Sequence, residues 1–160
     1  MAYDKKTFLK RVTVLVDTRE QKNQHILSAF DQLHVKYQDT KLDYGDYSFS
    51  ADGKDFSLSC VVERKGSADE FYSNITQDRQ RIEKEFYAAS SMGTDFTLLV
   101  EGCESMEALR GVEVPEWELA RLHRKEKEIG KICYSTIYSW MCGNRYQFHP
   151  VFILDSRQTA

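Results

Sequence analysis

Two short apolar runs constrain the fold of this chain most strongly. Arg11 to Asp17 is built from valine, threonine and leucine between charged ends, and Phe96 to Val100 is apolar apart from one threonine. Runs this short that are apolar at nearly every position are typical of strands covered on both faces of a sheet. Asp17 ends the first run, and Glu63 to Lys65 directly follow the apolar pair Val61-Val62, so charged groups gather at strand ends, where α/β folds place their sites.

Amphipathic stretches between the strands predict helices. The apolar residues of Gln24–Leu33 recur three and four apart, and Ser67 can cap a second helix, with Glu70 completing a capping box. The least regular part is Arg110–Lys131, where Pro115 can start a helix. The remaining predicted elements are helices over Asp78–Ser90 and Ser135–Cys142 and short strands over Val35–Asp39 and Val151–Leu154. This alternation predicts an α/β domain, a mixed central β-sheet flanked by helices on both faces.

Bulk composition predicts one globular domain over residues 1–160. The chain is 41% hydrophobic and 29% charged, and no apolar run approaches the roughly 20 residues that span a bilayer. Residues 1–6 are polar and do not resemble a signal peptide, so we expect a cytoplasmic protein without a membrane partner. Four cysteines and four histidines are dispersed, which disfavours a zinc site. A net charge of −3 argues against a protein that coats nucleic acid but allows a local site.

A hairpin with charged ends is the most informative segment. Tyr47–Ser50 and Phe56–Val62 flank a turn over Ala51–Asp55 that contains aspartate and glycine. Asp46 stands before the first strand, directly after Gly45, whose missing Cβ lets the chain bend sharply.

The end of the second strand supplies the matching groups. Side chains alternate along a strand, so Glu63 and Lys65 share one side while Arg64 points to the other. Asp46 and Glu63 can then hold one hard cation through oxygen, as Mg²⁺ or Mn²⁺ requires, while Lys65 orients water or stabilises negative charge.

A further carboxylate and a simpler interpretation both need weighing. Asp17, at the tip of a neighbouring strand, is a candidate for direct or water-mediated metal binding, and Glu20 is a weaker one. Acidic residues near a hairpin are usually solvated, and an isolated D…E-x-K pattern recurs by chance. Here the apolar pair Val61-Val62 precedes Glu63, which places the charges at the edge of a sheet instead of in a free loop.

At these residues the sequence resembles the XPF/Mus81 (ERCC4-type) nuclease domain family. The family signature is a G-D pair, a variable hairpin and then E-R-K-x-x-x-D. Further agreement comes from Leu98–Glu101 and from Pro150–Ile153 followed by Ser156-Arg157. The blocks that carry the match are Val16–Glu20, Leu42–Tyr47 and Val62–Lys65 with Asp69.

The resemblance implies a restriction-endonuclease-like fold and a Mg²⁺- or Mn²⁺-dependent DNA endonuclease that prefers branched or flap structures. It assigns metal binding and water handling to Asp17, Asp46, Glu63 and Lys65, with Asp17, Asp46 and Glu63 as the metal ligands. Arg19, Arg64 and Asp69 become supporting site residues, with Asp69 expected to hold Arg64 by a charge-assisted hydrogen bond. Arg79 or Arg81 corresponds to a downstream arginine of the family.

The chain also differs from eukaryotic members, which add a tandem helix-hairpin-helix module. Without it, we expect substrate binding to depend on the nuclease domain, a partner chain or a homodimer, or the basic Arg121–Lys131 stretch. That stretch is either a DNA contact or a solvated helix face, the usual role of a charge run. Aromatic residues nearby (Tyr134, Tyr138, Trp140, Tyr146) either stack on bases or belong to the core or an interface. We expect a compact stand-alone form of this domain to be encoded by a phage or bacterial genome. If it is encoded by a phage, we expect the protein in the cytoplasm of the host cell.

Two function classes follow from these observations. The first is a structure-selective endonuclease for forks, flaps or junctions in recombination, repair or replication, or more broadly a nicking or single-strand nuclease that serves replication, recombination or packaging. The second is a non-catalytic DNA-binding or scaffold subunit of a nuclease complex. Degenerate partners lose the acidic and lysine set, whereas Asp17, Asp46, Glu63 and Lys65 are all present here, which favours the enzyme.

Overall fold

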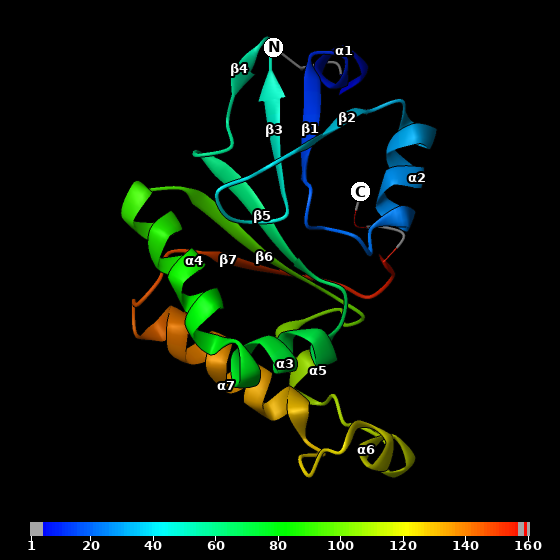
Figure 1. Ribbon diagram of the computed structural model, residues 1–160, viewed down its shortest axis with the longest axis vertical. Helices are drawn as coiled ribbons and strands as arrows, with labels where there is room; N and C mark the ends of the chain where they lie inside the picture. The colour runs from blue at the N-terminus through cyan, green and yellow to red at the C-terminus, as the bar shows by residue number, and fades with distance from the viewer. Residues whose placement is uncertain (1–4, 157–158, 160) are drawn as a thin grey trace.

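The computed structural model describes residues 5–156 and Thr159, so Arg157 and residues 1–4 lie outside the described part. The chain forms a mixed seven-stranded sheet in the order β2-β1-β3-β5-β6-β7, with β4 paired to β3 (Figure 1). The strands are β1 (Val12–Asp17), β2 (Lys36–Thr40), β3 (Tyr47–Ala51), β4 (Lys54–Asp55), β5 (Cys60–Lys65), β6 (Asp95–Glu101) and β7 (His149–Ile153). The helices are α1 (Lys5–Leu9), α2 (Gln24–Leu33), α3 (Ala68–Gln77), α4 (Arg79–Met92), α5 (Met106–Arg110), α6 (Glu116–Leu122) and α7 (Ile129–Cys142).

Helices cover both faces of the sheet, as predicted. Val61 of β5 packs in a large core with α3, α4 and α7, whereas the next residue, Val62, packs in a smaller core with Ile26 and Phe30 of α2. Because neighbouring residues of a strand point to opposite faces, the two cores lie on opposite sides of the sheet. The mixed α/β sandwich is therefore confirmed.

Aromatic side chains fill the larger core. Phe86 of α4 lies with its ring centroid 4.6 Å from Phe96 of β6 and 5.0 Å from Trp140 of α7. Trp140 is fully buried, so these rings fix the two long helices against β6. Aromatic pairs of this kind contribute about 0.5–1.5 kcal/mol beyond their buried area.

The two strands of the predicted hairpin are paired over a shorter length than the sequence suggests. β5 begins at Cys60 instead of Phe56, because Phe56 starts a turn in which its carbonyl accepts hydrogen bonds from Ser59 N and Cys60 N. β3 and β5 pair directly only at Tyr47 and Val62. The two strands thus approach each other at the end that carries Asp46 and Glu63, and separate toward β4.

Two further elements begin at least two residues earlier than predicted. The final strand begins at His149 and includes Pro150, which an edge strand tolerates because no N–H is needed there. The helix predicted over Ser135–Cys142 is the second half of α7, which begins at Ile129. Pro115 directly precedes α6, as expected, and α6 projects at one end of the molecule (Figure 1).

Within residues 5–156, no helix is both long and apolar enough to cross a membrane. The cytoplasmic location stays a prediction.

Candidate active site

Asp46 lies where β3 and β5 come together. Its backbone N–H donates to Val62 O at 2.8 Å, and its carboxylate Oδ2 accepts from Arg64 N at 2.7 Å. The Asp46 side chain thus binds the backbone of β5 just before β3 begins at Tyr47. Gly45 has a φ of +77°, and a Cβ there would lie 3.1 Å from Val61 Cβ and 3.3 Å from Val62 O. Only glycine suits this left-handed position against the neighbouring strand.

Glu63 and Lys65 form a buried ion pair on one side of β5. Lys65 Nζ donates to Glu63 Oε1 at 2.6 Å, and both residues are less than 5% exposed. Burial by itself lowers the pKa of the Lys65 ammonium, but the Glu63 carboxylate outweighs this effect and the pKa lies above its usual value. Lys65 is therefore a fixed positive charge at this site.

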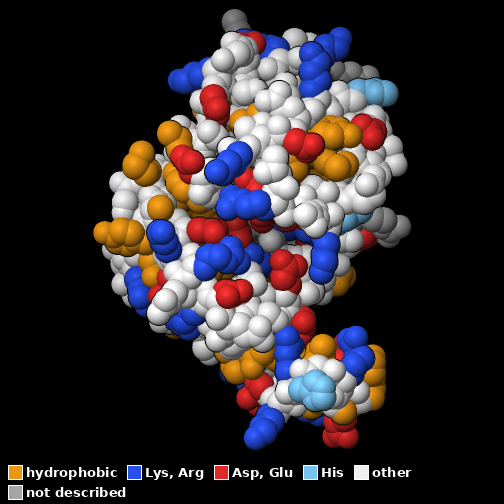
Figure 2. All heavy atoms as spheres, in the orientation of Figure 1, with side chains coloured by type: hydrophobic (Ala, Val, Ile, Leu, Met, Phe, Trp, Pro, Cys, Tyr) orange, Lys and Arg blue, Asp and Glu red, His pale blue; other side chains and the backbone are white. Residues whose placement is uncertain are grey.

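These residues line a cavity of about 220 Å³ between the sheet and two helices. Its walls come from the loop after β1, the turn before β3, the end of β5, and α3 and α4. Figure 2 shows acidic and basic side chains interleaved at the centre of this face. The lining residues are Arg19, Glu20, Gly45, Asp46, Glu63, Arg64, Lys65, Glu70, Asn74, Arg81 and Glu85.

Within the described part of the chain, the cavity brings five carboxyl groups together with four cationic side chains. Burial and the neighbouring Glu63 carboxylate raise the pKa of Asp46 to about 8. Burial also raises the pKa of Glu20 and of Glu85. Carboxylates that resist ionisation next to each other are the electrostatic setting that a bound cation relieves.

Asp17 lies outside the lining of this cavity and its oxygens are already occupied. Oδ1 accepts from Arg19 N at 2.8 Å and Arg19 Nε at 2.6 Å, while Oδ2 accepts from Leu42 N at 2.7 Å. Burial alone would raise the pKa of Asp17, but these hydrogen bonds outweigh it and hold the pKa below its usual value. Asp17 ties the loop after β1 to Leu42 and holds Arg19, which lines the cavity.

The prediction that Asp69 holds Arg64 by a hydrogen bond is wrong. The Arg64 guanidinium points to the opposite face of β5, where Nη1 contacts Glu20 Oε1 at 3.2 Å and Nη2 donates to Glu101 Oε2 at 2.7 Å. Asp69 instead faces outward from the start of α3 and pairs with Arg124, whose Nη2 also donates to Ser73 Oγ at 2.7 Å. The two residues do not meet because Glu101 and Glu20 engage the Arg64 guanidinium, whereas Arg124 engages Asp69.

Helices α3 and α4 add four residues that the sequence interpretation largely missed. Glu70 and Asn74 come from α3, and Arg81 and Glu85 from α4, each pair four residues apart. That spacing puts each pair on one helix face, and it is the signal that could have identified them. Arg81, and not Arg79, reaches the cavity, which separates the two candidates for the downstream arginine.

The donor set fits a cation held by two carboxylates. No group of three or more His, Cys, Asp or Glu side chains in the described part of the chain is arranged to hold a metal ion. Of the three assigned metal ligands, Asp46 and Glu63 line the cavity and Asp17 does not, while the weaker candidate Glu20 also lines it. Magnesium is usually bound through one or two carboxylates and keeps several waters. The carboxylates of Asp46 and Glu63 therefore suit a magnesium ion.

The basic Arg121–Lys131 segment is mostly engaged within the protein. Arg121 pairs with Glu118, Lys127 with Glu113, and Lys131 with Glu128. These ion pairs favour the solvated-surface interpretation over a dedicated phosphate-binding run.

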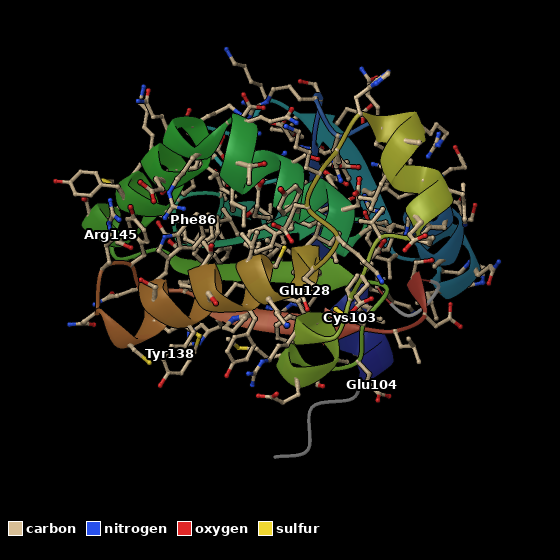
Figure 3. All side chains as sticks on the ribbon, turned by 90° about the horizontal axis from the view of Figure 1, so that it is seen from below. Phe86, Cys103, Glu104, Glu128, Tyr138 and Arg145 are labelled. Carbon is tan, nitrogen blue, oxygen red and sulfur yellow. The ribbon has the colours of Figure 1, made fainter. Side chains whose placement is uncertain are left out.

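The nearby aromatic residues divide between core and surface. Trp140 and Tyr146 belong to the core. Tyr138 is 53% exposed, points away from the body of the molecule in Figure 3, and stacks on Tyr134 with centroids 5.9 Å apart. Of the four aromatics, this stacked pair is the one placed at the surface of α7.

A mixed sheet flanked by helices, with a carboxylate and lysine cavity at its strand ends, defines a restriction-endonuclease-like domain. The ERCC4 domain matches residues 16–140, a span that includes the residues predicted for the site, from Asp17 to Asp69. The chain belongs to the ERCC4 domain family. The family indicates nuclease-type DNA processing, and its nucleases generally depend on a divalent metal. No curated protein sequence matches the chain at a significant level.

Proposed function

We propose that the protein is a divalent-metal-dependent endodeoxyribonuclease that hydrolyses phosphodiester bonds in branched, flap or junction DNA. The observation that supports this most is the convergence of Asp46, Glu63 and the buried Lys65 in one cavity. Two oxygen ligands beside a fixed ammonium are what hydrolysis of a phosphodiester needs. The preference for branched DNA, and a role in recombination, repair or replication, rest on the family resemblance.

The residues divide the chemistry between them. Asp46 and Glu63 would hold Mg²⁺ or Mn²⁺, which when bound supplies a Lewis acid and a water of lowered pKa. Lys65, held by Glu63, stabilises negative charge on the scissile phosphate and orients the attacking water. Arg19 and Arg81 line the cavity with side chains more than half exposed, so they are available to phosphates. Asp17 acts by holding Arg19 there.

A cleavage panel tests the proposal. The purified protein is incubated with labelled fork, flap, Holliday junction and linear duplex in Mg²⁺, Mn²⁺ or EDTA. We expect cutting of branched DNA with metal, none with EDTA, and loss of cutting in Glu63→Gln. Glu104→Gln removes the same charge from an exposed residue and should cut normally.

The panel also tests the alternative. DNA binding without cleavage under any metal would identify a non-catalytic DNA-binding or scaffold subunit. Cutting that survives Glu63→Gln would overturn the assignment of the site.

A further inference from the structure

A buried chain of charged groups runs along the face of β5 opposite Glu63 and Lys65. Glu101, at the end of β6, binds Arg64 Nη2 at 2.7 Å, and Arg64 Nη1 contacts Glu20 at 3.2 Å. The side chains are 2%, 5% and 12% exposed in that order. Glu20 and Arg64 line the cavity, while Glu101 does not.

We propose that Glu101 is a positioning residue for this site: through Arg64 it fixes Glu20 and Asp46, two of the five carboxylates of the described residues that line the cavity. The inference rests on the proposed function, because it concerns the same cavity. It assigns to Arg64 the role of a buried strut between Glu101 and the site instead of a contact to substrate.

Arg64 contacts Glu20 and Asp46 through different groups. Its backbone N–H donates to Asp46 Oδ2 at 2.7 Å, and its guanidinium holds Glu20 Oε1. A shift of Arg64 would therefore move both carboxylates together. Bonds of this kind, one step removed from a metal ligand, orient the ligand and tune its affinity.

Glu101 decides where the guanidinium lies. Among the described residues, Arg64 Nε has no hydrogen-bond partner, so the guanidinium is fixed by Glu101 and Glu20 alone. Removing one partner from a buried ion pair leaves an uncompensated charge. Without Glu101, the Arg64 guanidinium would draw Glu20 away from the cavity.

Glu101 is itself held from two other parts of the chain. Its Oε1 lies 3.1 Å from His25 Nε2 of α2 and accepts a hydrogen bond from the Thr159 hydroxyl. The carboxylate is thus bound on both oxygens, which gives Arg64 a rigid partner and couples the site to α2.

The test compares Glu101→Gln with Glu104→Gln. Both changes remove one carboxylate charge, but Glu104 is exposed and lies at the edge of the molecule beside α5 (Figure 3). Two readouts do not need activity: hydrogen exchange of the Arg64 amide by NMR, and Mn²⁺ affinity by electron paramagnetic resonance. In Glu101→Gln we expect faster exchange of that amide and Mn²⁺ affinity lowered about tenfold, with neither change in Glu104→Gln.

A double variant separates positioning from general destabilisation. If Glu101 acts through Arg64 on Glu20, the effects of Glu20→Gln and Glu101→Gln on Mn²⁺ affinity will not add, whereas independent effects add. Should Glu101→Gln fail to fold, Glu101→Asp keeps the charge, shortens its reach and is read in the same way. Equal amide exchange and Mn²⁺ affinity in the Glu101 and Glu104 variants would overturn the inference. A wild-type protein that binds Mn²⁺ but cuts no DNA would refute the proposed function and leave these readouts able to decide the role of Glu101.

Discussion

The carboxylate of Asp46 accepts the backbone N–H of Arg64 at 2.7 Å, so a cavity-lining side chain takes the place of a strand-to-strand hydrogen bond. The bond uses Oδ2, while Oδ1 of Asp46 has no hydrogen bond of its own to a residue of the described chain. Strand pairing and the cavity are therefore linked at one residue. A change in the pairing of β3 with β5 will therefore move the Asp46 carboxylate, which we assign to metal binding.

The raised pKa of Asp46 predicts a pH dependence of stability in EDTA. Its pKa is about 8 in the folded protein and ordinarily 3.8, because burial and Glu63 disfavour the ionised form. Between these values the folded state holds a proton that the unfolded state has lost, so the stability contribution falls as pH rises and is gone above about pH 8. Urea unfolding of the wild type should show this decline.

Asp46→Asn supplies the control for the pH experiment. The asparagine side chain cannot ionise, so the free energy of unfolding of the variant should lack the decline seen in the wild type. Any advantage in stability that the wild type has over the variant at pH 5 should therefore shrink or change sign by pH 9. With Mn²⁺ present, the wild type should instead gain stability with pH, because the cation binds the deprotonated carboxylate. The same pH profile in both proteins would exclude Asp46 as its source.

Lys65→Met should separate catalysis from metal binding. Removing the ammonium leaves the Glu63 carboxylate without its 2.6 Å partner, which strengthens the attraction of the cavity for a cation. We expect tighter Mn²⁺ binding together with cleavage slowed by about 10²–10³-fold, the usual loss for one charge-stabilising donor. Lys125→Met, at an exposed position, is the control. Loss of Mn²⁺ binding in Lys65→Met would mean that the lysine supports the site structurally.

Much of the site could be predicted from the sequence because it depends on local rules. Strand alternation correctly separates Glu63 and Lys65 from Arg64, and the sharp bend expected at Gly45 is made with a positive φ. The partner of Arg64 could not be predicted, since Glu101 is 37 residues away along the chain and meets it only through the parallel pairing of β5 with β6. Local spacing likewise could not show that Arg19 and Leu42 would occupy both oxygens of Asp17.

Gly130 should be intolerant of even one added methyl group. A Cβ there would lie 2.1 Å from Leu109 O and 2.7 Å from Val112 N, both backbone atoms of the segment around α5. Alanine gains about 1 kcal/mol of helix propensity, but overpacking of a rigid contact costs about 1–3 kcal/mol, and a backbone neighbour places this site at the upper end. We expect Gly130→Ala to lower the free energy of unfolding by about 2 kcal/mol.

Gly111→Ala is the matched control for Gly130→Ala. The added Cβ would lie 3.5 Å from Ala108 O, an ordinary contact, and the residue has a right-handed φ of −81°. Its free energy of unfolding, measured by urea titration, should change by less than about 0.5 kcal/mol. If both variants lose the same stability, the close packing of α7 on α5 is not the cause.

Arg81 and Arg79 offer a test of which arginine of α4 meets DNA. Both form ion pairs four residues apart, Arg81 with Glu85 and Arg79 with Glu83, and their side chains are 54% and 47% exposed. Only Arg81 lines the cavity. Arg79 also lies over the Trp140 ring, 5.8 Å from its centroid, so Arg79→Ala loses a packing contact, while only Arg81→Ala removes a cation from the cavity.

We expect Arg81→Ala to weaken binding of branched DNA and to lower the salt dependence of log affinity by about one phosphate contact, with KM raised more than kcat is lowered. Arg79→Ala should leave the affinity for branched DNA and its salt dependence close to the wild-type values. Fluorescence anisotropy with a labelled flap across a salt series measures the affinity and its salt dependence, in EDTA so that cleavage does not interfere, and cleavage rates in Mg²⁺ give KM and kcat. An equal reduction of the salt slope in both variants would place the DNA over the whole exposed face of α4 and not specifically at the cavity.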